Sequence, residues 1–163
     1  MIREATEQDA EVITEIFNYY IRNTVITFEE DEINTDHFIE RNNKVKKSEF
    51  SWLVAVDEGD VIGFAYSSRW IERASYRNTA EVSIYLAHTV TSKGWGTKLY
   101  NELFSTLREK SIHIVLGGIT LPNPASVAIH EKFGMKKVAH FEQVGYKFGE
   151  WLDVGYWQVQ LNT

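Results

Sequence analysis

Hydrophobic positions along the chain follow two spacings, one typical of helices and one typical of strands. From Val12 to Ile21, apolar residues recur every three or four positions, which predicts a helix with one buried face. Thr6 and Asp9 precede this segment and resemble a helix start. A second face of this kind follows a pair of glycines and consists of Leu99, Tyr100, Leu103, Phe104 and Leu107.

Two further helices are indicated by residues that favour helix ends. Asn34 or Thr35 is placed to cap a helix that runs toward the polar segment "KVKKSE". Asn123 followed by Pro124 is a start signal, because proline lacks an N–H that the first helical turn leaves unpaired anyway. This last helix is expected to stop at Gly134.

Strand-like segments lie between and after these helices. Alternating or β-branched apolar residues mark each of them. Glu58, Gly59 and Asp60 separate two of the runs and indicate a hairpin. The segments are 2–4, 24–28, two runs within 51–70, 79–87, 112–119, and the closing pair "KKVAHFEQV" and "DVGYWQVQL".

The resulting order is β-α-β-α, a hairpin and a third strand, then α-β-α-β-β. Helices must therefore cover a mixed sheet, which predicts the α/β (α+β) class. A length of 163 residues suits one domain with a full core, so a single domain over residues 1–163 is expected.

Composition narrows the function. The net charge of -6 argues against a nucleic-acid partner, which usually selects a basic face. With no cysteine, thiolate nucleophiles and zinc–thiolate sites are excluded, and no metal-ligand spacing emerges among histidines and carboxylates. The start does not read as a signal peptide, and no apolar run approaches the ~20 residues that span a bilayer. No metal, no membrane and a cytoplasmic location are therefore expected.

The segment "TSKGWGTKLY" places Gly94 and Gly96 between a predicted strand and a predicted helix. Free N–H groups at a helix N-terminus bind anions, and glycine lets the backbone approach closely. Lys93 and Lys98 add positive charge. Spacing alone leaves a phosphate cradle and a plain turn open, since Leu99 stands where the dinucleotide fingerprint needs a third glycine.

Two segments together resemble a known family. "VTSKGWGTKLYNELF" resembles the pyrophosphate loop of the GNAT N-acetyltransferases, and "NPASVAIHEKFGM" resembles that family's second signature, in the same order. "TAEVSIYL", "ERASYRNTAE" and "GYKFGEWLDVGYWQ" are similar to the phosphinothricin acetyltransferase branch, which includes methionine sulfoximine and methionine sulfone acetyltransferases. The resemblance covers nearly the whole chain and implies the GNAT fold, a mixed twisted central sheet flanked by helices.

The resemblance implies an acetyl-CoA-dependent N-acetyltransferase. Its substrate would be the α-amine of a small amino-acid analogue, acetylated by direct transfer within a ternary complex. The cofactor arm would pair with the strand "SIYL" and its pyrophosphate would lie on the glycine turn. The implied cofactor contacts are Ile84, Tyr85, Leu86, Ser92, Lys93, Gly94, Trp95, Gly96, Thr97, Asn123 and Ser126.

Glu81 and His130 are the candidate catalytic residues. The branch uses a glutamate at the matching position as general base, and burial would raise its pKa toward the value a base needs. His130 stands where many GNAT enzymes carry a tyrosine, and it could protonate the leaving thiolate or relay the amine proton. The alternatives are an exposed strand carboxylate and a structural histidine. The other four histidines are interpreted as structural.

The acceptor would be held by two loops. The resemblance places Arg73 and Tyr76 before the Glu81 strand, where an arginine can pair with an acidic group of the substrate. Phe28 and Glu29 would wall the pocket. For these residues, surface charge and ordinary packing are the alternatives.

Three positions depart from the branch. Thr91 stands where the loop usually has Gln or Arg, Ile71 where the herbicide-inactivating enzymes carry a lysine, and Phe148 where they carry a histidine. Thr91 bears on the contact with CoA, for which Lys93 is the compensating charge, whereas Ile71 and Phe148 weaken the case for phosphinothricin itself as the preferred substrate.

The resemblance also implies a homodimer, with Lys147, Trp151 and Asp153 near the partner's site. Two other functions remain open. One is a protein or peptide N-acetyltransferase, and the other is a non-catalytic sensor that binds acyl-CoA.

Overall fold

The computed structural model describes residues 1–48, 50–90 and 93–161. Its strands form one seven-stranded sheet in the order β1-β2-β3-β4-β5-β7-β6. The strands are β1 (Ile2–Glu4), β2 (Trp52–Asp57), β3 (Asp60–Arg69), β4 (Thr79–Leu86), β5 (Ile114–Leu121), β6 (Lys136–Lys147) and β7 (Glu150–Gln160). The helices are α1 (Ala10–Asn23), α2 (Thr35–Lys47), α3 (Trp95–Glu109) and α4 (Pro124–Lys132), with short 3₁₀ helices η1 (Glu7–Asp9) and η2 (Ala74–Tyr76).

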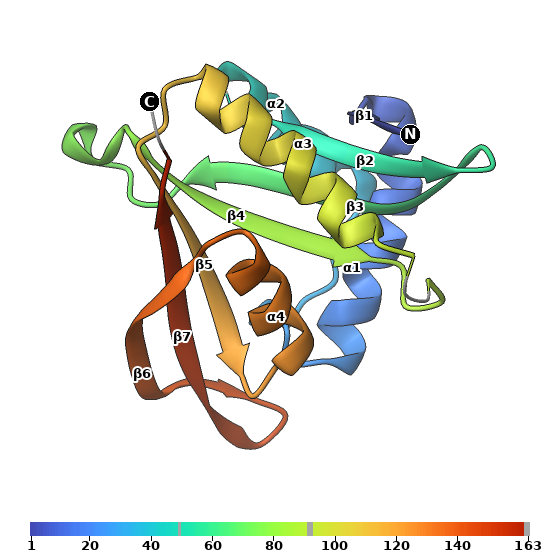
Figure 1. The fold of residues 1–163 in the computed structure, drawn as a ribbon. Helices are drawn as coiled ribbons and strands as arrows, with labels where there is room; N and C mark the ends of the chain where they lie inside the picture. Colours follow the sequence, from blue (N-terminus) through green and yellow to red (C-terminus); the bar gives the residue numbers. More distant parts are fainter. Residues whose placement is uncertain (49, 91–92, 162–163) are drawn as a thin grey trace.

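The helices lie in two layers, with α1 and α2 behind the sheet and α3 and α4 in front of it (Figure 1). The apolar faces of α1 and α3 are buried against the sheet, from Ile13 to Ile21 and from Leu99 to Leu107. The predicted α/β class with a mixed sheet between helices is confirmed. Among the described residues, no helix is long and apolar enough to cross a membrane.

Helix starts agree with the sequence prediction. Asn34 Oδ1 accepts a hydrogen bond from the backbone N–H of His37 at 2.9 Å. Asn123 Oδ1 accepts one from Ser126 at 3.2 Å, so both asparagines cap their helices. Beyond α4, Gly134 has a φ of +82°, a conformation that favours glycine.

The strand predicted at 24–28 is wrong. These residues form part of the α1–α2 loop, residues 24–34, and no strand runs through it. Two threonines bond to the local backbone: the Thr24 hydroxyl donates to Tyr20 O at 2.8 Å, and Thr27 Oγ1 accepts from Glu29 N at 3.3 Å. Such local bonds compete with a sheet ladder, and the β-branched composition did not outweigh them.

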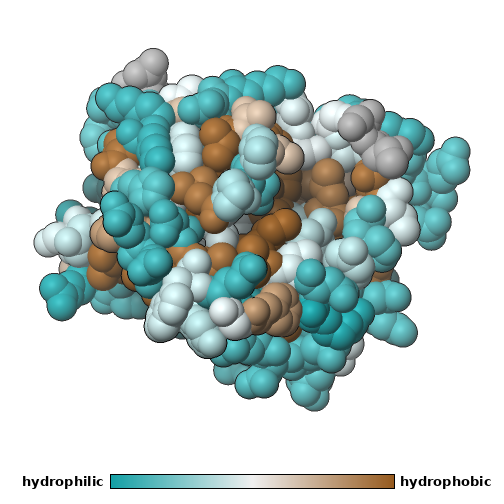
Figure 2. Space-filling model, turned by 90° about the horizontal axis from the view of Figure 1, so that it is seen from below, coloured by the Kyte–Doolittle hydropathy of each residue, from teal (hydrophilic) through white to brown (hydrophobic). Residues whose placement is uncertain are grey.

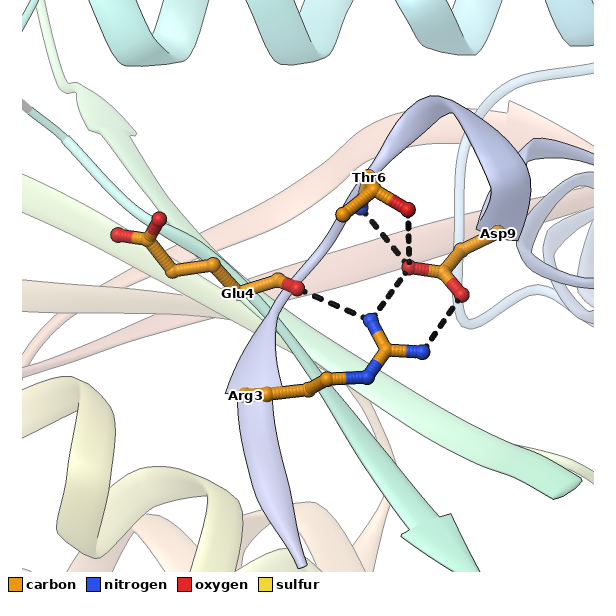
Figure 3. Close-up of polar contacts among 4 residues, drawn as sticks. All are labelled: Arg3, Glu4, Thr6 and Asp9. Atoms are coloured by element: carbon orange, nitrogen blue, oxygen red, sulfur yellow. Dashed lines mark hydrogen bonds and ion pairs between the residues drawn. The ribbon is translucent and has the colours of Figure 1, made fainter. Parts of the chain in front are cut away.

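A bidentate ion pair joins the first strand to the first helix (Figure 3). Arg3 donates from both terminal nitrogens to the carboxylate of Asp9, at 2.8 and 2.9 Å. Asp9 also accepts from the backbone N–H of Thr6 at 2.8 Å. Because Arg3 and these hydrogen bonds favour the charged form, the pKa of Asp9 lies below its usual value.

The central strands part halfway along their length. β4 pairs in parallel with β5 only from Thr79 to Glu81, opposite Ile114 to Leu116. Beyond Glu81 the two strands diverge (Figure 1), while β5 stays paired with β7 as far as Leu121. The second half of β4 therefore has a ladder partner on its β3 side only.

The Asp9 carboxylate should stabilise the fold at neutral pH. We expect Asp9→Asn to lower the free energy of unfolding by about 1–3 kcal/mol at pH 7, because charged hydrogen bonds to Arg3 and Thr6 are lost. Because the pKa of Asp9 is lower in the folded state, its contribution to stability is fully present above the unfolded-state pKa of about 4. That contribution is lost as the pH falls through the folded-state pKa. Urea unfolding at pH 7 and pH 3 should show the deficit shrinking in acid. Glu7→Gln is the control, and an equal deficit at both pH values would contradict the argument.

Candidate active site

Two adjoining cavities lie where β4 and β5 part. The larger, of about 500 Å³, is here called the large cavity and is lined by Ile26, Thr27, Phe28, Glu81, Tyr85, Gly118, Thr120, Phe141, Val144, Val154 and Tyr156. The narrow cavity, of about 50 Å³, is lined by Ile26, Val82, Ser83, Ile84, Tyr85, Tyr100, Gly118, Ile119, Thr120, Asn123, Ser126 and His130. Four lining residues are common to both cavities, so the cavities are neighbouring parts of one site. These are Ile26, Tyr85, Gly118 and Thr120. Seen from the end where the β6–β7 hairpin turns, hydrophobic residues gather in a hollow bordered by hydrophilic ones (Figure 2).

Glu81 supplies the acidic group of the large cavity. It is half-buried on β4, in the last residue pair before the strands part. Burial raises the pKa of its carboxyl, and a hydrogen bond with Tyr156 offsets part of that rise. A carboxylate with a raised pKa is closer to the value that a general base needs near neutral pH.

Tyr156 is a site residue that the sequence analysis missed. It lies on β7 opposite Gly118, and burial raises the pKa of its hydroxyl, so it stays protonated. A Cβ added to Gly118 would meet the Tyr156 ring and hydroxyl at 3.1 to 3.3 Å, so glycine leaves room for this side chain. The alternation of "DVGYWQV" could have placed Tyr156 on the face opposite Trp157. Its approach to Glu81 depends on a register across β5 that no local pattern predicts.

The α1–α2 loop forms the opposite wall through Phe28. The Phe28 ring packs over Gly145 of β6, so closely that a Cβ there would overlap it. Lys147 is buried and donates from Nζ to the carbonyl of Thr27 at 2.8 Å. Burial lowers the pKa of this lysine. Lys147 thus holds the loop of its own chain, and its place near a partner's site stays a prediction.

Three of the predicted substrate residues line neither cavity. Glu29 forms an ion pair with Arg41 at 2.7 Å. Arg73 is exposed just before η2, and Tyr76 packs its ring edge-on against Trp70. Within one chain, the structure therefore brings together Phe28 and Glu81 but not Glu29, Arg73 or Tyr76.

His130 lies in the wall of the narrow cavity and is only 4% exposed. Its Nδ1 is 2.7 Å from the carbonyl of Ser126, which requires a donated N–H. Its Nε2, 3.1 Å from the Tyr100 hydroxyl, is then the acceptor. Burial lowers the pKa of His130 and raises that of Tyr100, so the imidazole is neutral and the phenol protonated.

A third cavity, the glycine-turn cavity, surrounds the start of α3. It has a volume of about 320 Å³ and is lined by Leu86, Val90, Lys93, Gly94, Trp95, Gly96, Thr97, Ala125, Ala128, Ile129 and Lys132. Gly94 has a left-handed φ of +73° and precedes the first helical residue. A Cβ on Gly96 would lie 2.9 Å from Ile129, so glycine permits close approach of α3 and α4. Thr91 and the predicted contact Ser92 lie outside the described residues.

The chain matches known proteins along nearly its whole length. The family model for the acetyltransferase (GNAT) domain matches residues 2–155. The chain is 32% identical to the L-methionine sulfoximine/L-methionine sulfone acetyltransferase of Salmonella typhimurium, covering 99% of this chain and 94% of that protein.

Two solved structures have a TM-score of 0.96 and 32% identity over 99% of this chain. One is a GNAT phosphinothricin acetyltransferase from Sinorhizobium meliloti in complex with acetyl-CoA, of which 88% is covered. The other is the ribosomal-protein-alanine N-acetyltransferase from Brucella melitensis, of which 99% is covered. The chain therefore belongs to the GNAT acetyltransferase family, as its sequence motifs indicated. It is an enzyme of the transferase class.

The position of His130 should depend on the glycine beside it. A Cβ on Gly117 would lie 2.6 to 2.7 Å from the His130 ring. We expect Gly117→Ala to lower the free energy of unfolding by about 1–3 kcal/mol through overpacking. Removing the imidazole should relieve that overlap, so Gly117→Ala should cost less in a His130→Ala background. Urea unfolding of the four proteins of the cycle measures this coupling, and strictly additive effects would contradict the proposed contact.

Proposed function

We propose that this enzyme transfers the acetyl group of acetyl-CoA to the α-amine of a small amino-acid analogue. The methionine sulfoximine, methionine sulfone and phosphinothricin class is the favoured substrate. The observation that carries the proposal is the half-buried Glu81, with its raised pKa, in a cavity that opens where β4 loses its ladder to β5. Relatives named for these activities support the choice of acceptor.

The residues around the parted strands fit acetyl-CoA. The N-terminus of α3 offers unpaired N–H groups after Gly94, and Lys93 and Lys132 line the same cavity, which suits a pyrophosphate. The β4 edge from Ile84 to Leu86 has no β5 partner and suits the amide groups of an extended arm, except at the Leu86 carbonyl, which accepts from the Tyr20 hydroxyl at 2.5 Å.

Asn123 and Ser126 line the narrow cavity, where they could contact that arm. Each already serves α4, because Asn123 Oδ1 caps the helix and the Ser126 carbonyl accepts from His130. The Asn123 amide nitrogen and the Ser126 hydroxyl are the groups we assign to the cofactor.

The cosubstrate supplies an activated acyl thioester, and the chain positions and deprotonates the amine. A peptide-like α-amine has a pKa near 8 and is mostly protonated at neutral pH, so it must lose a proton before attack. We assign that proton to Glu81, directly or through water. The N–C bond then forms as the C–S bond breaks, and a backbone N–H of β4 can stabilise negative charge on the carbonyl oxygen.

The proton for the leaving thiolate has two candidate sources. Tyr156 is protonated, lines the large cavity and hydrogen-bonds Glu81. His130 is neutral, and both of its ring nitrogens are already hydrogen-bonded, Nδ1 to the Ser126 carbonyl and Nε2 to the Tyr100 hydroxyl. These contacts favour the structural alternative for His130, and we assign the acid role to Tyr156. No cysteine is available for an acetyl-enzyme, in keeping with direct transfer.

Removing the Glu81 carboxylate should abolish most of the activity. We expect Glu81→Gln to lower kcat/KM by about 100- to 10,000-fold and to leave the Kd for acetyl-CoA unchanged. In the wild type, kcat/KM should rise with pH through the raised pKa of Glu81, because the base must be ionised, and that limb should vanish in the variant. A thiol-release assay with methionine sulfoximine, methionine sulfone and phosphinothricin measures both. Glu109→Gln, an exposed change on α3, is the control, and a loss below threefold in Glu81→Gln would overturn the assignment.

A peptide acceptor is the second candidate, favoured by the equal similarity to the ribosomal-protein-alanine N-acetyltransferase. A peptide beginning with alanine therefore belongs in the same assay. Turnover confined to that peptide would replace the small-amine proposal, and tight acetyl-CoA binding without turnover on any amine would indicate a sensor.

We also propose that the enzyme is a homodimer through the β6–β7 hairpin. Large apolar side chains on this hairpin, its turn included, are 45% to 64% exposed, an arrangement that usually marks an interface. They are Val138, Phe141, Val144, Tyr146, Phe148 and Trp151.

Light scattering on purified protein should give the mass of two chains. We expect Trp151→Asp to shift the population to single chains, because a desolvated carboxylate at the interface is costly. Glu109→Gln, an exposed change on α3 away from the hairpin, should leave the mass unchanged. A single-chain mass for the wild type would contradict the proposal.

A further inference from the structure

A separate cavity lies on the α1–α2 side of the sheet, between α2 and the ends of β2 and β3. We call it the α2 cavity; its volume is about 270 Å³. Its lining residues line neither the large, the narrow nor the glycine-turn cavity. They are Arg41, Lys44, Val45, Ser48, Phe50, Trp52, Tyr66, Ser68, Arg69 and Glu72.

Aromatic rings form one wall of the α2 cavity. The rings of Trp52 and Tyr66 stack with centroids 4.2 Å apart and planes 16° apart. Phe50 adds a third ring and is almost fully buried. Stacked rings of this kind present a flat, apolar surface, which suits a flat apolar ligand.

Three cationic side chains, Arg41, Lys44 and Arg69, and one carboxylate, Glu72, line the same cavity in a chain whose net charge is -6. Among the described residues, Lys44 and Arg69 have no ion-pair partner, whereas Arg41 pairs with Glu29. Lysines near the end of a helix complement its dipole, which accounts for Lys44 on α2. Arg69 belongs to β3 and is half-buried, so the helix dipole does not account for it.

A buried hydrogen-bond donor is a third notable feature of the residues around this cavity. The indole Nε1 of Trp52 is buried and has no hydrogen-bond partner within the described part of the chain. Trp52 is only 6% exposed and lines the α2 cavity. Leaving a buried N–H unpaired costs about 1–3 kcal/mol, so the fold gains stability if an acceptor atom reaches this nitrogen.

We propose that the α2 cavity binds a small carboxylic acid with a flat apolar body. The carboxylate pairs with Arg69 and Lys44, and the apolar body packs against the wall that Phe50, Trp52 and Tyr66 form together. An arginine and a lysine together give the carboxylate charge-assisted hydrogen bonds from two sides. The ring wall and the cations thus select an organic acid over an inorganic anion.

The α2 cavity is linked to the large cavity through two contacts. Ser68, in its lining, is the cross-strand partner of Glu81. Arg41 holds Glu29, whose neighbour Phe28 lines the large cavity. A carboxylate bound near Arg41 competes with Glu29 for the same guanidinium. The acid is either a separate effector or the carboxylate end of an acceptor that reaches across Ser68.

Calorimetric titration of the full-length protein with 3-phenylpropionate, at saturating CoA, tests the site. We expect saturable binding, weakened about tenfold or more by Arg69→Ala and by Lys44→Ala, and no binding of 3-phenylpropanol, which lacks the charge. Lys46→Ala, on the same helix but outside the cavity lining, should bind like the wild type. Trp52→Phe keeps a ring and removes the indole donor, so it should weaken binding less than Arg69→Ala. Thermal unfolding of each variant shows that it is folded.

A second arm identifies the source of the acid. The titration is repeated with methionine sulfone present. If methionine sulfone competes with 3-phenylpropionate, the acceptor's own carboxylate occupies the α2 cavity. If the two do not compete, the acid is a separate effector. Either result supports the site. No saturable binding, or equal affinity for wild type, Arg69→Ala and Lys44→Ala, overturns it. No step requires turnover, so failure of the proposed acetyl transfer would leave this result readable.

Discussion

β4 and β5 exchange backbone hydrogen bonds over three residue pairs and then diverge, and the arrangement of the other parts follows from that divergence. A strand edge without a ladder exposes unpaired polar groups, which a fold usually covers. Here α4 and the start of α3 lie beside the opening and leave cavities rather than a sealed core. The backbone of β4 is thereby available to a bound molecule while its other edge stays fixed to β3.

Adjacent glycines on β5 separate the two faces of the site. Gly117 gives space to the His130 ring on the α4 side, and Gly118 gives space to Tyr156 on the other. Because successive strand residues point to opposite faces, the lack of a side chain at both glycines leaves room for one ring on each face of the sheet. The neutral His130–Tyr100 pair lies on the face that α3 and α4 cover, and the ionisable Glu81–Tyr156 pair lies on the opposite face.

Local signals in the sequence predicted much of this structure. Asn34, Asn123 and Gly134 mark helix ends that the structure confirms, because capping depends on a few neighbouring atoms. Glu81 and Phe28 line one cavity, and their roles as base and pocket wall stay predictions. The strand at 24–28 was wrong because threonine hydroxyls bond to the loop's own backbone.

Other features escaped prediction because they join distant segments. Tyr156 reaches Glu81 across β5, and Lys147 reaches Thr27 from 120 positions away, contacts that depend on strand register. The ring wall and cations of the α2 cavity come from α2, the segment before β2, and the strands β2 and β3, and no motif in the sequence links them.

The α1–α2 loop is held by residues near the end of the chain, through Phe28 on Gly145 and through Thr27 on Lys147. During synthesis on the ribosome, the loop emerges long before its anchors do. The wall that contains Phe28 can therefore take its final position only after Gly145 and Lys147 have been made. The large cavity is completed late in synthesis, although Glu81 and the α1–α2 loop are made early.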